Sequence, residues 1–255
     1  MEELAREGIG AVSGGYSPEA IIIHESDGRV DNLKLFKKGL FQVQDEGAQI
    51  ISHLLDPQPG EQILDVCAGL GGKTSHIREL MKARGLLVAL DNNLIRLINL
   101  KKNLLRLGID KIPVVRADAT LSLSSLLRCR FDRIMIDAPC SGLGTLSRHP
   151  DGKWTRDKDA IPRLSGTQKM ILQAASTVLR TGGVMLYATC TVSREENEDV
   201  IHDFLEKNSR FRLVDLHKHV PGWGREFIDT QGFFRTSPAT HHMDGFFAAL
   251  LRKYN

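Results

Sequence analysis

The sequence predicts an α/β fold, in which a doubly wound and mostly parallel sheet of seven strands carries helices on both faces. First, apolar runs of strand length alternate with amphipathic runs of helical length from residue 62 onward, as in strand–helix–strand units. Second, a glycine-rich turn at residues 68–72 separates the first of these strands from a helix. Third, 255 residues with 42% hydrophobic content can fill the core of one large domain, and two domains are not required.

The predicted elements follow one another in a regular order along the chain. The strands are expected at residues 63–67, 86–90, 113–115, 131–136, 184–188, 211–216 and 245–251. Helices are expected from Lys73 onward and at residues 94–107, 164–179 and 195–205. The chain shows no internal repeat and no low-complexity segment.

The first 60 residues are predicted to form an N-terminal arm, and residues 61–255 the main domain. We expect residues 1–18 to be irregular, and residues 19–25 and 33–43 to be short strands on either side of a turn at Asp27–Gly28. Asp45 is a candidate cap for a helix that runs to about residue 55. The arm is interpreted as an appendage or as the remnant of a larger domain.

Composition excludes several classes of protein. No run of apolar residues approaches the 18 or so that a membrane span requires, and the N-terminus lacks the basic and apolar regions of a signal peptide. The four cysteines show neither CxxC spacing nor a disulfide framework. We therefore expect a cytoplasmic protein with no metal and no membrane partner. The sequence does not determine the oligomeric state, and a monomer is favoured.

The charge is unevenly distributed along the chain. Residues 1–60 carry 5 basic and 10 acidic side chains, a net charge of −5, so a total of +3 leaves +8 on the other 195 residues. Between residues 141 and 180, seven basic side chains stand against three acidic ones. This local excess suits a polyanionic partner. A solvated helix face would explain the same charges.

The glycine-rich turn reads DVCAGLGGKT, from Asp65 to Thr74. A P-loop requires a glycine where this chain has Cys67, and a dinucleotide-binding fingerprint requires one at Thr74. A nucleoside-binding loop without a dedicated phosphate cradle remains, at the N-terminus of a helix. The candidate binding residues in this loop are Cys67, Ala68, Gly69, Leu70, Gly71, Gly72 and Lys73.

Two acidic residues close the next two strands. Asp91 lies 19 residues beyond Gly72, at a distance typical of the carboxylate that binds a ribose diol. A plain helix N-cap is the alternative role for Asp91. Asp118 closes the following strand, at a position that suits contact with an adenine amino group.

Two cysteines follow two apolar strands that are expected to be neighbours in the sheet. Asp137 and Cys140 come after residues 131–136, and Cys190 comes after residues 184–188. Neighbouring strands lie about 4.8 Å apart, so both thiols are predicted to face one pocket at the carboxyl ends of the strands. Buried cysteine is also a common core residue, which is the alternative for each thiol taken alone. Cys129, in the basic link RCR, is interpreted as incidental.

With these motifs in place, the chain resembles the Sun/Fmu/Nop2 (NSUN) family of S-adenosylmethionine-dependent RNA cytosine-5 methyltransferases, and bacterial 16S rRNA members in particular. The resemblance rests on DVCAGLGGKT, DAPCSGLGTLSRHPD and YATCTVSREENE, with VQDEGAQ upstream and DGFFAALLRK at the end. It covers residues 41–255. One departure is CAGLGGK where the family usually has CAAPGGK. Most bacterial relatives also carry an N-terminal RNA-binding domain, for which 60 residues are too few.

The resemblance implies a class I, Rossmann-like methyltransferase fold, S-adenosylmethionine as cofactor and RNA as partner, with rRNA favoured over tRNA. It implies that Cys190 attacks cytosine C6, that Cys140 assists release of the product, and that Asp137 binds the cytosine edge. Lys73 would orient the target or Asp137. The implied cofactor-binding residues are Cys67, Ala68, Gly69, Leu70, Gly71, Gly72, Lys73, Asp91, Asp118 and Asp137.

Three alternatives stay open at this point. The first is a methyltransferase acting on tRNA or at another position of a nucleobase. The second is a catalytically idle RNA-binding assembly factor that keeps the fold, which the presence of both Cys140 and Cys190 disfavours. The third is a P-loop nucleotidase, which Cys67 disfavours.

Overall fold

The computed structural model describes residues 1–25, 29–148 and 159–255. The expected turn at Asp27–Gly28 lies outside these residues. So do three of the basic side chains counted between residues 141 and 180, namely Lys153, Arg156 and Lys158.

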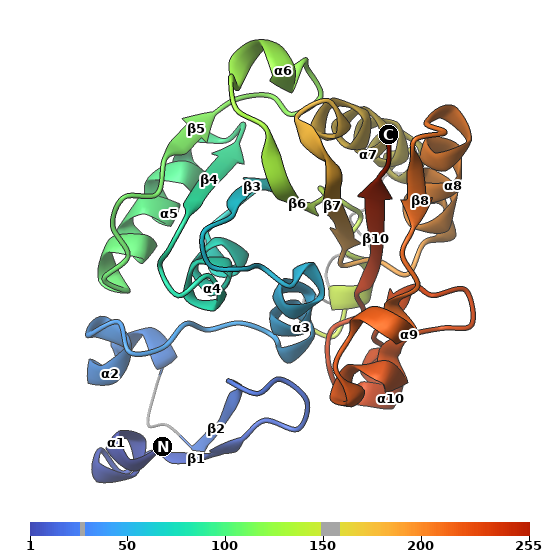
Figure 1. Cartoon of the computed structure of the whole chain (residues 1–255). Helices are drawn as coiled ribbons and strands as arrows, with labels where there is room; N and C mark the ends of the chain where they lie inside the picture. Colours follow the sequence, from blue (N-terminus) through green and yellow to red (C-terminus); the bar gives the residue numbers. More distant parts are fainter. Residues whose placement is uncertain (26–28, 149–158) are drawn as a thin grey trace.

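The centre of the molecule is the predicted doubly wound sheet (Figure 1). Its strands are β3 (Gln62–Val66), β4 (Leu86–Asp91), β5 (Val114–Arg116), β6 (Phe131–Asp137), β7 (Leu179–Thr189), β8 (Phe211–Leu213), β9 (Phe234–Arg235) and β10 (Phe247–Lys253). Seven of them run in the order β5-β4-β3-β6-β7-β10-β8, and the two-residue strand β9, which was not predicted, pairs with β10. The pairs from β5 to β7 are parallel, and β10 is antiparallel to β7, β8 and β9.

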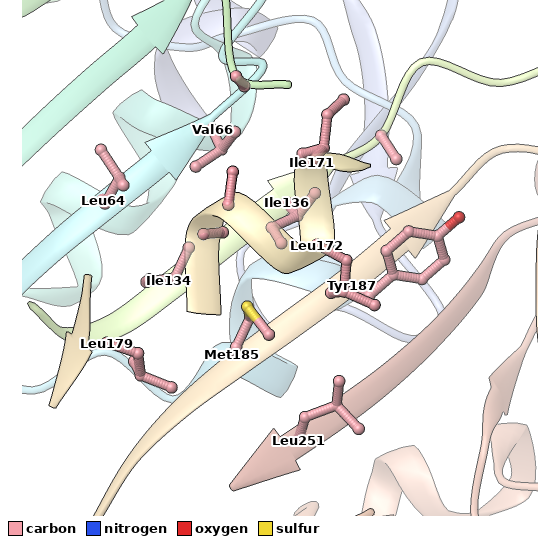
Figure 2. Packing of buried hydrophobic residues seen from close by; sticks show 14 of the residues in the cluster. Leu64, Val66, Ile134, Ile136, Ile171, Leu172, Leu179, Met185, Tyr187 and Leu251 are labelled. Carbon is pink, nitrogen blue, oxygen red and sulfur yellow. The ribbon is translucent and has the colours of Figure 1, made fainter. Parts of the chain in front are cut away.

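Helices cover both faces of the sheet because successive strand residues point to opposite faces. The longer helices are α3 (Glu46–Leu55), α4 (Gly72–Leu80), α5 (Leu94–Arg106), α7 (Ala160–Ser176) and α8 (Glu198–Lys207). Ile134 and Ile136 of β6 join a core cluster with α7 and α8, whereas Met135 between them joins a second cluster with α3 and α4. Figure 2 shows the first cluster, where Leu172 of α7 lies against β6 and β7. Every strand residue in these clusters is buried, which explains why the sequence reads as nearly continuous apolar runs.

The short elements at the two ends of the chain differ more from the prediction. Residues 1–18 contain α1 (Glu2–Arg6) and β1 (Gly10–Ser13), and β1 pairs antiparallel with β2 (Ile21–Glu25). The other short elements are α6 (Leu123–Leu126), α9 (Leu216–His219), α10 (Pro238–His241), and the 3₁₀ turns η1 (Val30–Asn32), η2 (Leu143–Thr145), η4 (Arg194–Glu196) and η5 (Gly222–Phe227).

The predicted strand at residues 33–43 is wrong, because this segment forms α2 (Lys34–Lys37) and an irregular stretch. The Arg106 guanidinium of α5 lies 3.8 Å from the centre of the Phe36 ring and donates to the backbone oxygens of Phe36 and Phe41. Leu35 is buried with Leu4 and Ile9. Phe36 and Phe41 of this segment are thus held by one arginine, and the segment does not pair with a sheet.

Several boundaries also shift. The helix predicted at residues 164–179 begins at Ala160 and ends at Ser176, and Leu179 already belongs to β7. The helix predicted at residues 195–205 starts at Glu198, after the 3₁₀ turn η4. The strand predicted at residues 211–216 ends at Leu213, and Leu216 begins the short helix α9.

Asp45 caps α3 as predicted, since its side chain accepts a hydrogen bond from the Gly47 N–H at 2.9 Å. The apolar residues Ile51 and Leu54 of α3 belong to the same core cluster as β7 and β10. The division of the chain at residue 61 stays a prediction. Among the helices of the described residues, none is both long and apolar enough to cross a membrane.

Candidate active site

The carboxyl ends of four parallel strands bring most of the predicted site residues to one edge of the sheet. Val66 of β3 pairs with Leu90 of β4 and with Ile136 of β6, so the loops after these strands start side by side. Asp137 of β6 pairs in turn with Ala188 of β7. This is the edge where ligands bind in open α/β sheets.

The two thiols predicted to share a pocket are in contact. The sulfur atoms of Cys140 and Cys190 lie 3.3 Å apart. The loops that carry them are joined by a hydrogen bond from the Gly144 N–H to the Cys190 carbonyl oxygen at 3.0 Å. Gly144 must be glycine because a Cβ built there would lie 1.9 Å from the carbonyl oxygen of Gly245. The two sulfurs therefore lie together after β6 and β7, as expected, whereas a pocket that they share stays a prediction.

The two thiols titrate in opposite directions. The hydrogen bond between them lowers the pKa of Cys190 and, together with burial, raises that of Cys140 well above its usual range. Lys73 also lowers the pKa of Cys190, against the opposing effects of burial and of Asp137. These opposite shifts favour Cys190 over Cys140 as the sulfur that ionises first.

Lys73 and Asp137 form an ion pair beside the thiols. Lys73 Nζ, in the first turn of α4, donates to Asp137 Oδ2 at 2.8 Å, with only 11% of the lysine side chain exposed. Burial alone would lower the pKa of Lys73, but the Asp137 carboxylate outweighs it and raises that pKa. The Lys73 ammonium also lies 5.4 Å from the centre of the Phe246 ring. Both side chains are consequently held in place before any ligand binds.

The glycine-rich loop has a backbone that most side chains would strain. Gly69, Gly71 and the non-glycine residue Cys67 have φ values of 57°, 85° and 63°, in the left-handed region. A Cβ at Gly71 would also lie 2.9 Å from Cγ of Leu100. The loop keeps this conformation without the proline of the usual family motif.

Asp91 supports that loop. Its Oδ2 accepts from the Gly69 N–H at 2.9 Å and its Oδ1 accepts from the Asn93 N–H at 2.8 Å, and the residue is 3% exposed. The N-cap of α5 is Asn93, whose side chain accepts from the Arg96 N–H. Asp91 is therefore not the N-cap of α5, and its carboxylate lies against the glycine-rich loop. Its role in binding a ribose stays a prediction.

The remaining candidates lie around these residues. Leu70 is 59% exposed at the rim of the loop, and burial raises the pKa of the Cys67 thiol. Asp118 is exposed and accepts two hydrogen bonds from Thr120, which lower its pKa. None of its hydrogen bonds within the described residues joins it to another predicted site residue. Cys129 packs against the core cluster that includes α7, as expected of an incidental cysteine.

The sequence reasoning missed the buried polar groups behind the thiols. Glu196 and Asn197 have no exposed surface, although they stand in the acidic run REENED that reads as a solvated helix start. Glu196 accepts from Ser141, and Asn197 bonds to Thr191. The only available signal was that the run directly follows Cys190 and belongs to the motif YATCTVSREENE.

Side chains of metal-ligating types also converge at His76 of α4. Glu19, His53 and His76 have ligand atoms within 4.8 Å of one another, and His53 already hydrogen-bonds Glu19 at 2.8 Å. The three residues come from separate segments with no ligand spacing. The absence of a metal stays a prediction.

Comparison with known proteins agrees with the predicted fold and family. Residues 52–252 match the family of 16S rRNA methyltransferases RsmB/F. The chain is 35% identical over 254 residues to "Probable ribosomal RNA small subunit methyltransferase B" of Bacillus subtilis, covering 99% of this chain and 56% of that protein. The chain thus spans about half the length of the curated relatives it matches.

Two solved structures from Pyrococcus horikoshii show the same architecture. A methyltransferase homolog protein has a TM-score of 0.82 at 30% identity, covering 99% of this chain and 81% of its own. NSun6, solved with SFG, has a TM-score of 0.77 at 32% identity, covering 89% of this chain and 57% of its own.

These matches confirm the predicted class I methyltransferase fold and support S-adenosylmethionine as the cofactor. The predicted family resemblance is confirmed as well. Since the family match extends over residues 52–252 and a curated relative is 35% identical over nearly the whole chain, the chain belongs to the RsmB/F family of 16S rRNA methyltransferases.

Proposed function

We propose that this chain transfers a methyl group from S-adenosylmethionine to C5 of a cytosine in 16S rRNA, through a covalent bond between Cys190 and cytosine C6. The observation that carries this proposal is the pair of thiols 3.3 Å apart, next to the Lys73–Asp137 ion pair. A methyltransferase that acts on an amino group needs no nucleophilic sulfur. Two sulfurs with opposite pKa shifts suit a reaction that needs both a thiolate and a thiol.

The cofactor fits the loop after β3. The backbone of residues 67–71 takes left-handed conformations at three positions, and α4 begins there with N–H groups that have no helical partner. The Asp91 carboxylate at the end of β4 would hold the ribose diol. Bound at this edge of the sheet, S-adenosylmethionine supplies an electrophilic methyl group beside Asp137 and the thiols.

The Cys190 thiolate would start the reaction by attack on cytosine C6. The new sulfur–carbon bond makes C5 an enamine-like carbon that accepts the methyl group. A base then removes the C5 proton, the electron pair re-forms the C5–C6 double bond, and the Cys190 sulfur leaves as thiolate. Asp137 would hydrogen-bond the N3 and amino edge of the cytosine, and Lys73 holds Asp137 in position.

Cys140 would assist the release of the methylated product. Burial and the bond to Cys190 keep its pKa high, so it remains a thiol at neutral pH. By donating to Cys190 across the 3.3 Å contact, it would stabilise the sulfur that leaves C6. The two cysteines would thus take different roles because the surroundings of their side chains differ.

Mapping of 5-methylcytosine tests the proposal. We expect one or a few positions in 16S rRNA to lose 5-methylcytosine in cells that lack the protein, and to regain it when the wild-type gene is restored, but not when a Cys190→Ala gene is. Nucleoside mass spectrometry on separated rRNA and tRNA fractions identifies both the methylated atom and the RNA. Loss of the mark from tRNA alone would favour the tRNA alternative. Unchanged methylation in both fractions would favour an assembly factor.

A further inference from the structure

Two adjacent buried residues join the loops that carry the two thiols. Glu196 ends the 3₁₀ turn η4 and Asn197 precedes α8, and neither has exposed surface. The proposed function gives neither residue a contact with the cofactor or with the cytosine. Within the described residues, the hydrogen bonds of their side chains go to residues next to Cys140 or Cys190 and to Gln168 of α7.

Glu196 holds the residue that follows each cysteine. Its Oε1 accepts from the Ser141 N–H at 2.8 Å, and its Oε2 accepts from the Ser141 hydroxyl at 2.5 Å. Oε2 also accepts from the Thr191 hydroxyl at 3.2 Å, and the two hydroxyls lie 2.8 Å apart. One carboxyl group therefore joins the loop after β6 to the loop after β7.

Asn197 holds both neighbours of Cys190. Its Oδ1 accepts from the Thr189 hydroxyl at 2.6 Å, and its Nδ2 donates to the Thr191 carbonyl oxygen at 2.9 Å. The chain on either side of the sulfur is fixed by a single amide. Because an asparagine side chain is planar, the two bonds also fix the direction of the intervening residue.

The pair is anchored from behind by two elements. The Tyr187 hydroxyl of β7 donates to the Glu196 carbonyl oxygen at 2.6 Å. Gln168 Nε2 of α7 donates to Glu196 Oε1 at 3.0 Å and to the Pro139 carbonyl oxygen at 2.9 Å. Pro139 immediately precedes Cys140, so both sides of that cysteine are tied to the same network as well.

We propose that Glu196 and Asn197 are positioning residues that hold Cys140 as hydrogen-bond donor to Cys190, and so set the reactivity of the nucleophile. This inference rests on the proposed function for its biological meaning. The 3.3 Å sulfur contact joins two loops that share no covalent link, so its length depends on how each loop is held. A carboxyl group that accepts from both loops fixes them relative to each other, and a buried network of this kind is stiff only while every donor has its acceptor.

The test is the pH dependence of Cys190 alkylation by iodoacetamide, followed by mass spectrometry of the whole chain. Glu196→Gln keeps the size of the side chain but places an amide nitrogen where one oxygen accepted. We expect the alkylation profile of Cys190 to move to higher pH by about one unit, which slows alkylation at pH 7 about tenfold because the thiolate fraction falls by that factor. In Cys140→Ala protein, Glu196→Gln should have a much smaller effect.

Two further variants keep the test decisive. Ser141→Ala removes one hydroxyl from the network and should shift the profile in the same direction by a smaller amount, even if Glu196→Gln folds poorly. Ile201→Val, at a buried position of α8, is the control for a loss of packing alone and should leave the profile unchanged. All measurements are made below the melting temperature of each variant.

Methyl transfer supplies the second readout. Glu196→Gln should lower kcat while the KM for S-adenosylmethionine stays within about twofold, since none of the hydrogen bonds of Glu196 within the described residues goes to a proposed cofactor contact. An unchanged alkylation profile in both Glu196→Gln and Ser141→Ala would overturn the inference and leave Glu196 a structural residue. Since alkylation needs no turnover, the inference can hold even if the proposed reaction fails.

Discussion

At the scale of single residues, the active-site edge holds ionisable groups whose environments push their pKa values apart. Cys190 is favoured as thiolate and Cys140 as thiol, although both are cysteines on equivalent strand ends. The hydrogen bond between the two sulfurs acts on the two pKa values in opposite directions, and Lys73 also lowers the pKa of Cys190. Such divergence between like groups is typical of catalytic sites and uncommon in a packed core.

Asp65 gives a residue-scale prediction of pH dependence. Complete burial, with smaller contributions from Asp137 and Asp91, raises its pKa from 3.8 to about 7, and its Oδ1 has no hydrogen-bond partner within the described residues. The folded protein thus holds a proton that the unfolded chain releases. Stability should fall as pH rises from about 4 to about 7, by up to about 4 kcal/mol.

The variant Asp65→Asn isolates this effect. Asparagine can still accept from the Thr74 hydroxyl but does not titrate. Burial lowers the pKa of His76 to about 4 from 6.5 and acts in the opposite sense over part of that range, so the difference between wild type and variant is the quantity to measure. Urea unfolding should show that the free energy of unfolding of the variant, relative to that of the wild type, is higher at pH 8 than at pH 5. Equal differences at both pH values would contradict the assignment.

The place of a site residue in the fold was predictable wherever the residue stands at the end of a strand or shortly after it. Cys140, Cys190, Asp137 and Asp91 follow apolar runs, and the parallel register brings them together as expected. Glu196 was not predictable in this way. Its acidic neighbours are consistent with a solvated helix start, and only the folded chain brings Ser141, 55 positions away, against its oxygens.

At the scale of elements, the loops after β6 and β7 are positioned by a close backbone approach. Gly144 and Gly245 are joined by a hydrogen bond from the Gly245 N–H to the Gly144 carbonyl oxygen at 2.8 Å. This contact ties the start of β10 to the loop that follows Cys140. No side chain fits between the two backbones.

Gly144→Ala should therefore destabilise the protein by about 1–3 kcal/mol, because the backbone must move to admit a methyl group. The matched control is Gly166→Ala in α7, where a Cβ meets nothing within 4 Å. This substitution should stabilise the protein by about 0.5–1 kcal/mol, since alanine favours the helix interior. Thermal and urea unfolding of both variants test the pair. If Gly144→Ala leaves the free energy of unfolding unchanged, the two loops are not held by this contact.

Long periodic elements were predicted well and short ones were not. The strand at residues 131–136 and the helix at residues 94–107 match β6 and α5 to within one residue at each end. Residues 33–43 were predicted as a strand because apolar and polar residues alternate there. In the structure, Arg106 contacts Phe36 and Phe41 of this segment. A contact with a residue so far along the chain leaves no pattern in the local sequence.

At the scale of the whole molecule, the sheet order explains why motifs far apart in sequence form one site. The first strand of this sheet, β3, lies in its middle. The next two strands, β4 and β5, extend the sheet on one side, and β6 and β7 then extend it on the other. The cofactor loop and the first cysteine loop therefore follow neighbouring strands, β3 and β6. This arrangement follows from the right-handed crossovers of doubly wound sheets, so it was predictable from the alternation of elements.

The charge distribution gives a prediction for RNA binding. The chain carries +8 on residues 61–255 against −5 on residues 1–60. We expect the affinity for single-stranded rRNA segments to fall steeply with salt, with a slope of log K against log salt of about −0.7 for each phosphate neutralised. Fluorescence anisotropy across a potassium chloride series measures this slope. A flat series would count against the basic residues of the main domain as the RNA contact.

The most direct measurement of the central claim is the covalent adduct between protein and RNA. Cys140→Ala protein, incubated with S-adenosylmethionine and labelled 16S rRNA, should accumulate a slowly migrating band on a denaturing gel, because release of the Cys190 sulfur is impaired. Cys190→Ala should give no such band and no methyl transfer. If the Cys190→Ala variant forms adducts as readily as Cys140→Ala, the assignment of nucleophile and release residue is contradicted.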